Sequence, residues 1–173
     1  FRSYPRVGGE TGGKNFVLAH PSADAGALVA AIIRGGYEYQ GQKCSPASRL
    51  FVPDSLWPDI KERLCEEIAT IKVGHVTDFS NFMGGVIDAK AWRRHMAVFD
   101  DVKGDSGAKV IVGGNGSDQE GYFVSPTLIQ TTDPASRLMT DEFFGPIVTA
   151  FVYPDREFEQ ITALINGSGA YGL

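Results

Sequence analysis

The chain has 173 residues, a length typical of one domain with a sizeable core. Hydrophobic residues make up 43% and charged residues 21%, near the averages for globular proteins, which argues against intrinsic disorder or a fibrous repeat. A net charge of -5 argues against a nucleic-acid partner, and two cysteines are too few for a disulfide-stabilised secreted scaffold.

The sequence predicts no membrane partner and a reducing compartment. Its longest uncharged apolar run, Ala25 to Ile33, is far short of the roughly 20 residues that a transmembrane helix needs. Residue 1 is Phe rather than Met, so we expect a fragment of a longer protein. A complete small domain with a processed start is the alternative.

The first half of the chain predicts strands that alternate with helices. The apolar run at 15–20 is bounded by glycine and proline, as is typical of a buried parallel strand. Ser22 is the expected cap of a helix that extends to residue 37. A strand is then expected at 49–52 and a helix over about 54–71.

The second half continues the same alternation. An amphipathic helix is expected over about 85–102, with Ile87 and His95 on its apolar side. Strands at 109–112, 127–129 and 147–153 and a helix at 155–166 follow, with a turn-rich run at 113–118. The fold class predicted is therefore α/β, with a mainly parallel sheet flanked by helices and no internal domain boundary.

One cysteine lies where a loop can present it to a ligand. Cys44 follows a glycine turn after the first expected helix and precedes a strand. The thiolate is the reactive form, and a neighbouring cation such as Lys43 could lower the pKa of the thiol if it points inward. From this context alone a structural thiol is favoured, because free cysteines are often buried. Cys65, inside a helix, is expected to be a packing residue.

Two acidic segments are further candidates. Glu10 lies among four glycines before the first strand and is either a turn residue or, paired with Cys44, a base that takes a proton from water. The segment 141–146 leads into the last strand, and taken alone its two phenylalanines read as core and its acids as solvated. The three histidines lie far apart, so no metal site is expected.

Together these segments resemble the aldehyde dehydrogenase family. The matching residues are Glu10-Thr11-Gly12-Gly13-Lys14, Gly41-Gln42-Lys43-Cys44 followed by Ser48-Arg49, and Glu142-Phe143-Phe144-Gly145-Pro146. Glu10 and Cys44 are 34 residues apart, the separation that the family shows between its glutamate and its nucleophile. The resemblance implies that residues 1–173 are a fragment of the family's catalytic domain, with the NAD-binding domain and a C-terminal segment outside this chain.

The resemblance also implies a mechanism with NAD as cofactor. Cys44 would attack an aldehyde, and Glu10 would activate the water that hydrolyses the resulting thioester. The backbone N–H of Cys44 would supply part of the oxyanion site. The remaining positions that it implies are Glu142, Phe144 and Gly12 for NAD and Ser45 for the substrate.

Several residues resemble one branch of the family. Thr11, the run 37–45 and the run 55–58 are similar to the branch that oxidises glutamate γ-semialdehyde, the open form of 1-pyrroline-5-carboxylate, in proline catabolism. A dehydrogenase for another aldehyde, or a noncatalytic assembly module of the same fold, remains an alternative. The resemblance implies a homo-oligomer in the cytoplasm, or in the mitochondrial matrix if the source is eukaryotic.

Overall fold

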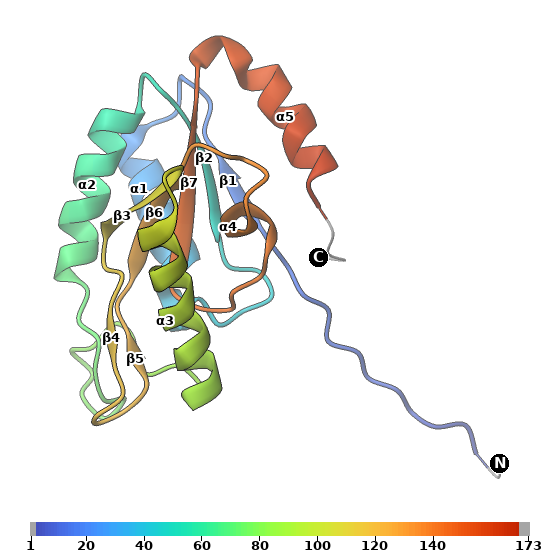
Figure 1. Ribbon diagram of the computed structural model, residues 1–173, viewed down its shortest axis with the longest axis vertical. Helices are drawn as coiled ribbons and strands as arrows, with labels where there is room; N and C mark the ends of the chain where they lie inside the picture. The colour runs from blue at the N-terminus through green and yellow to red at the C-terminus, as the bar shows by residue number, and fades with distance from the viewer. Residues whose placement is uncertain (1–2, 170–173) are drawn as a thin grey trace.

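The computed structural model describes residues 3–169, which form a layered α/β domain around one sheet (Figure 1). The five strands of this sheet lie in the order β1-β2-β7-β6-β3. They are β1 (Phe16–Leu18), β2 (Arg49–Pro53), β3 (Ala108–Val112), β6 (Thr127–Thr131) and β7 (Ile147–Tyr153). The pairs β1/β2, β2/β7 and β6/β7 are parallel, and only β3 joins antiparallel. The predicted fold class, a mainly parallel sheet, is confirmed.

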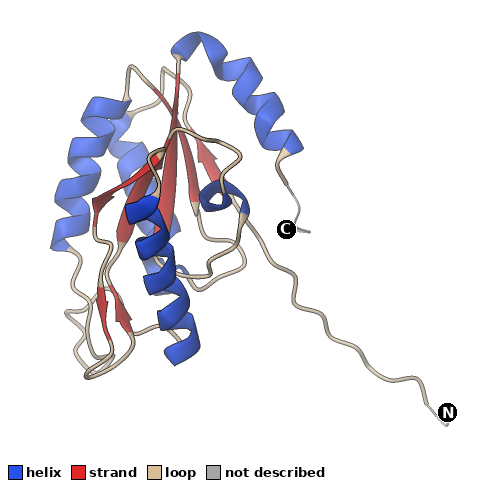
Figure 2. Cartoon of the chain, viewed as in Figure 1, coloured by secondary structure: helices blue, strands red, loops and turns tan. Residues whose placement is uncertain are grey.

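Helices cover both faces of the sheet, as Figure 2 shows. They are α1 (Ala25–Tyr37), α2 (Trp57–Thr70), α3 (Ala89–Gly104), α4 (Arg137–Thr140) and α5 (Phe158–Gly167). The apolar sides of α1 and α2 pack in one core, while α3 and α5 pack in two others. The sheet is therefore shielded from water on each face, which is the usual arrangement for parallel strands.

Strand β2 shows why this arrangement is stable. All five of its residues are buried. Leu50 and Val52 join the core beneath α1 and α2, whereas Phe51 points the other way and packs with Tyr153 and the α5 residue Ile161. Each fully buried side chain of this size stabilises the folded state by about 1.5–3 kcal/mol. Because successive side chains of a strand point to opposite faces of the sheet, one continuous apolar run contributes to two cores.

The starts of two helices differ from the prediction. Asp24 rather than Ser22 caps α1, because its Oδ1 accepts a hydrogen bond from the N–H of Ala27 at 2.7 Å. Asp88 caps α3, so that helix begins after residue 88 instead of at 85. Ile87 consequently precedes the helix and is 81% exposed, which corrects its expected place on the apolar side.

Short elements were missed for lack of periodicity. The turn-rich run at 113–118 contains β4 (Gly116–Ser117), which pairs antiparallel with β5 (Phe123–Val124). Two 3-10 turns, η1 (Glu38–Gly41) and η2 (Asp155–Glu157), precede the Cys44 loop and α5. None of the helices within residues 3–169 is both long enough and apolar enough to span a bilayer.

Candidate active site

The three segments that the sequence singled out meet at Gly13. Its backbone N–H donates a hydrogen bond to Oε1 of Glu142 at 2.9 Å, although the two residues are 129 positions apart. A Cβ at this position would collide with the backbone carbonyl of Cys44. The Nδ2 of Asn15 donates to that same carbonyl oxygen at 3.0 Å. The segment before β1 is therefore in contact with both the Cys44 loop and the Glu142 loop.

A left-handed turn leads from α1 into the Cys44 loop. Tyr39, Gln40 and Gly41 have φ values of 56°, 59° and 62°. A Cβ on Gly41 would collide with the backbone carbonyl of Gly145, so a glycine is needed where this turn approaches the Glu142 loop. The strained turn thus places the beginning of the Cys44 loop against the residues that precede β7.

Two glutamine side chains form hydrogen bonds between the same turn and a third loop, at residues 85–87. Gln42 accepts a hydrogen bond from the N–H of Ile87 at 2.8 Å. Gln40, which is buried, donates from its Nε2 to the carbonyl of Gly85 at 3.1 Å. These bonds restrain the backbone immediately before Cys44.

Cys44 itself is a half-buried free thiol, and the adjacent Ser45 is exposed. Both can therefore be reached from outside the chain. Lys43 does not take the inward position that the sequence left open for it. Its ammonium pairs with Glu38 at 3.0 Å, and that hydrogen bond and charge hold the pKa of the Glu38 carboxyl below its usual value.

Glu10 lies apart from the other site residues. It is exposed, in the extended segment that leaves the folded body at the N-terminal side (Figure 1). Gly12 is half-buried and Gly13 is buried, so the chain enters the body just after Glu10. The structure brings the Glu10 segment to Cys44 through its glycines, whereas the role of the Glu10 carboxylate stays a prediction.

The Glu142 loop divides its two phenylalanines between core and surface. Phe143 is buried, and its carbonyl lies 3.1 Å from Nε2 of His95. Phe144 is 38% exposed and has a φ of 55°. The core reading thus holds for Phe143 alone, while the backbone turns the next ring outward beside the half-buried Glu142.

Lys14 is a site residue that the sequence reasoning did not single out. It is only 5% exposed, and its Nζ lies 4.6 Å from the centre of the Phe143 ring. Burial, assisted by the charge of Arg49, lowers the pKa of Lys14 to about 7, against the opposing influence of Asp141 and Glu142. Its place directly after the Gly12-Gly13 pair of a motif was the one signal available, and periodicity could not reveal its burial.

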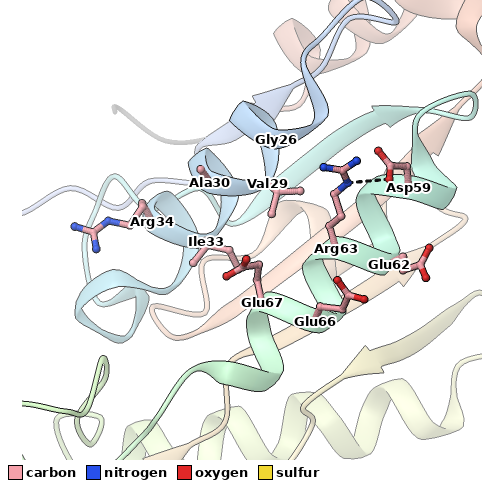
Figure 3. A pocket seen from close by; sticks show the side chains of 10 residues that line it. All are labelled: Gly26, Val29, Ala30, Ile33, Arg34, Asp59, Glu62, Arg63, Glu66 and Glu67. Atoms are coloured by element: carbon pink, nitrogen blue, oxygen red, sulfur yellow. Dashed lines mark hydrogen bonds and ion pairs between the residues drawn. The ribbon is translucent and has the colours of Figure 1, made fainter.

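A large hollow on the described chain lies elsewhere. A groove of about 670 Å³ runs between α1 and α2, with Val29, Ala30 and Ile33 on one side (Figure 3). The facing wall carries Arg63, which is paired with Asp59, and several glutamates. None of the residues that line this groove belongs to the three segments, so it is separate from the candidate active site.

Comparison with known proteins gives a family match over nearly the whole chain. The model described as "Aldehyde dehydrogenase family" matches residues 2–173. The mitochondrial Delta-1-pyrroline-5-carboxylate dehydrogenase of Danio rerio is 45% identical over 100% of this chain and 31% of its own length. The human protein of the same name is 42% identical with the same coverage. The chain thus spans about a third of the length of the curated relatives that it matches.

Solved structures agree in sequence and in fold. The Delta-pyrroline-5-carboxylate dehydrogenase from Mycobacterium tuberculosis, bound with NAD and cobalamin, is 43% identical with a TM-score of 0.92, over 100% of this chain and 32% of that chain. A betaine aldehyde dehydrogenase from Staphylococcus aureus in complex with NAD+ is 31% identical with a TM-score of 0.81, over 88% of this chain and 31% of that one. The first of these similarities covers the whole chain, including the loops that meet at Gly13.

Proposed function

The chain belongs to the aldehyde dehydrogenase family, and from this premise we propose that it is the catalytic-domain portion, residues 1–173, of a longer NAD-dependent enzyme. We propose glutamate γ-semialdehyde, the open form of 1-pyrroline-5-carboxylate, as its substrate and glutamate as its product. The names of the relatives support this substrate. The observation that carries the proposal is the contact of Gly13 with both the Cys44 carbonyl and the Glu142 carboxylate.

The described residues fit the nicotinamide end of NAD. One oxygen of the Glu142 carboxylate accepts the Gly13 N–H, which orients the group for ribose hydroxyls. The partly exposed Phe144 ring beside it offers an apolar surface to the nicotinamide. Gly12 has no side chain, which lets the cofactor approach the backbone closely. NAD, when bound, accepts the hydride in the oxidation. NAD-bound structures of relatives support this cofactor.

The chemistry on this chain centres on the Cys44 thiolate. Its Sγ forms a bond to the aldehyde carbon, and the carbonyl oxygen takes up the negative charge. After that carbon loses its hydride, a thioester links it to Cys44. Water then attacks the thioester while Glu10 takes the proton of that water, and the carboxylate product leaves as the thiolate is restored.

The geometry gives Glu10 a route to this step. Three residues of extended chain span about 10 Å, so Glu10 is tethered within that distance of Gly13 and its contact with Cys44. We propose that a rotation of residues 10–12 about Gly13 brings the carboxylate toward the thioester. Ser45, exposed next to the nucleophile, is proposed to contact the substrate.

The first test is to replace the nucleophile. In the full-length enzyme, Cys44→Ala is expected to lower NADH formation from glutamate γ-semialdehyde by at least about 1,000-fold, because no thioester can form. Cys65→Ala is the matched control. Cys65 is half-buried within α2, and burial raises the pKa of its thiol, so its loss should leave the rate within about twofold. Substantial activity in Cys44→Ala would remove Cys44 from the mechanism.

Kinetic measurements on the full-length enzyme distinguish the remaining alternatives. Glu10→Gln should give a stopped-flow burst of NADH followed by a slow steady state, because thioester hydrolysis becomes limiting. A higher kcat/KM for an aldehyde without the amino acid group would favour another semialdehyde or aliphatic aldehyde. NADH formation from none of these aldehydes would favour a noncatalytic assembly module.

We also propose a homo-oligomer, located in the cytoplasm or, in a eukaryote, in the mitochondrial matrix. The family resemblance supports the first point, and the mitochondrial names of several relatives support the second. Light scattering on the full-length enzyme tests the oligomer. A monomer at working concentration would contradict it.

A further inference from the structure

We infer that Lys14 is a positioning residue that couples the proposed NAD-binding carboxylate of Glu142 to the segment in contact with Cys44. The inference rests on the proposed function and concerns a residue that takes no part in the chemical steps. Lys14 directly follows Gly13, whose N–H holds Glu142 and whose backbone touches the Cys44 carbonyl. The Lys14 side chain adds a second connection between the segment before β1 and the Glu142 loop.

The contact of Lys14 with the Glu142 loop is electrostatic. Its Nζ lies over the Phe143 ring, 4.6 Å from the centroid, and has no hydrogen-bond partner within the described residues. A cation over an aromatic face is attracted by the electrons of the ring, and this attraction is stronger when the cation is desolvated. Because Phe143 follows Glu142 directly, a charged Lys14 holds the backbone that carries the carboxylate.

A buried ammonium without hydrogen bonds lowers the stability of the folded state, which argues that its position serves a purpose beyond packing. An apolar side chain of the same length would fill the space under Phe143 at lower cost. Arg137 lies over the same ring at 5.8 Å and is itself paired with Asp101 at 2.7 Å, so it can hold Phe143 from α4. Lys14 is the cation that contacts this ring from the segment before β1, which also contacts the Cys44 carbonyl through Gly13.

The charge of Lys14 can change within the working range of pH. Burial is the main cause that lowers its pKa to about 7, and Arg49 on β2 acts in the same direction. Asp141 and Glu142 act in the opposite direction. His95, which contacts the Phe143 carbonyl from α3, has a pKa that is lowered mainly by burial, away from the range of the test. Between pH 6.5 and 8.5, loss of the Lys14 proton should therefore loosen the Glu142 loop.

The test measures NAD binding to the full-length enzyme as a function of pH. We expect the Kd for NAD of the unmodified enzyme to rise roughly 3- to 30-fold between pH 6.5 and 8.5. Lys14→Met, whose unbranched side chain is one atom shorter and uncharged, should have at every pH the weaker affinity that the unmodified enzyme shows at pH 8.5, with kcat much less affected than KM for NAD. The Kd values for NAD of the two proteins should become equal near pH 8.5. A merely structural role of Lys14 would not produce this convergence.

A control variant and a second measurement complete the test. Lys103→Met removes an exposed lysine that pairs with Asp100 on α3 and should leave the pH profile unchanged. If Lys14→Met does not fold, the pH dependence of the unmodified enzyme still decides: a flat Kd for NAD across this range overturns the inference. So does a Lys14→Met enzyme with unchanged affinity, or with a fall in kcat alone. Active unmodified enzyme in those cases would leave the proposed function intact.

Discussion

At the scale of single residues, Gly13 and His95 show how the site depends on space and burial. Gly13 can lie between two loops because it lacks a Cβ, which would otherwise strike the Cys44 carbonyl. His95 is fully buried and lies against both Phe143 and Gly145, where even one added carbon would overlap its ring. Both residues act on the positions of their neighbours.

Gly13→Ala should displace the Cys44 loop. The added carbon meets backbone, which cannot rotate away, so we expect a loss of roughly 1–3 kcal/mol in the free energy of unfolding. Gly8→Ala is the control, since a Cβ there meets nothing within 4 Å and should change stability by less than about 0.5 kcal/mol. Urea denaturation of both variants decides, and equal stabilities would contradict the close approach.

His95 should make the fold sensitive to mild acid. Burial, with a smaller contribution from Arg94, lowers the pKa of His95, while hydrogen bonds with the backbone of Phe143 and Phe144 act against the shift. Below pH 6.5 the unfolded chain therefore binds a proton that the folded chain does not, so stability falls as pH decreases. His95→Gln should reduce this slope in urea denaturation between pH 7.5 and 5.5.

The control for that experiment is His75→Gln. His75 is exposed, so its replacement should leave the slope of stability against pH as it was. An identical slope in His95→Gln and in the unmodified chain would show that other groups cause the acid sensitivity.

At the scale of elements, local sequence specified most strands and helices but not where the helices begin. Strand β7 has the bounds that were predicted, because an uninterrupted β-type run is a signal in itself. The start of α1 depended on which of two nearby side chains bonds to a free N–H, and Asp24 does so. Such a choice is decided by geometry over a few ångströms, which residue type alone does not determine.

Contact between α1 and β7 gives a test at this scale. A Cβ on Gly36 would lie 2.5 Å from Cγ2 of Val148, so Gly36→Ala alone should cost roughly 1–3 kcal/mol. In a Val148→Ala background the 2.5 Å contact disappears and the 3.2 Å approach to the backbone oxygen of Ala47 remains, so with the better helix propensity of alanine the same change should cost much less. A coupling energy of about 1–3 kcal/mol is expected from thermal or chemical denaturation.

Gly104→Ala serves as the reference for this cycle. It also lies in a helix, at the end of α3, but a Cβ there meets nothing within 4 Å. Its effect should be the same with and without Val148→Ala. Additive effects for Gly36 would mean that α1 can shift away from the sheet at little cost.

At the scale of the whole molecule, the sheet order assembles the site. Strand β7 lies between β2 and β6, so the loop that precedes β7 comes next to the loop that precedes β2. These loops carry Glu142 and Cys44, and the segment before β1 reaches both. The proposed site therefore lies where the amino ends of three parallel strands meet, while the cores lie between the sheet and its helices.

The 173-residue chain by itself should bind NAD weakly and turn over little. Its proposed cofactor contacts, Glu142, Phe144 and Gly12, reach one end of NAD, and we propose that the remaining contacts come from another domain of the longer protein. We expect NADH formation at least about 100-fold slower than in the full-length enzyme. Alkylation of Cys44 by iodoacetamide would show that the loop is accessible in the same sample. A rate within tenfold of the full-length enzyme would contradict this division of the site.

By itself, the sequence determined the class of fold, the members of the three motifs and the family to which they belong. These follow from patterns along the chain: apolar periodicity records which faces are buried, and motif residues keep their order. Only the tertiary structure decided that Phe143 is core while Phe144 is exposed, that Lys43 pairs with Glu38, and that Lys14 is buried. The physical reason is that Lys14 and Phe143 pack against each other although they are 129 positions apart, which the order of strands in the sheet makes possible. The pair of Lys43 with Glu38 depends instead on the left-handed turn between these two residues, which residue type alone does not predict.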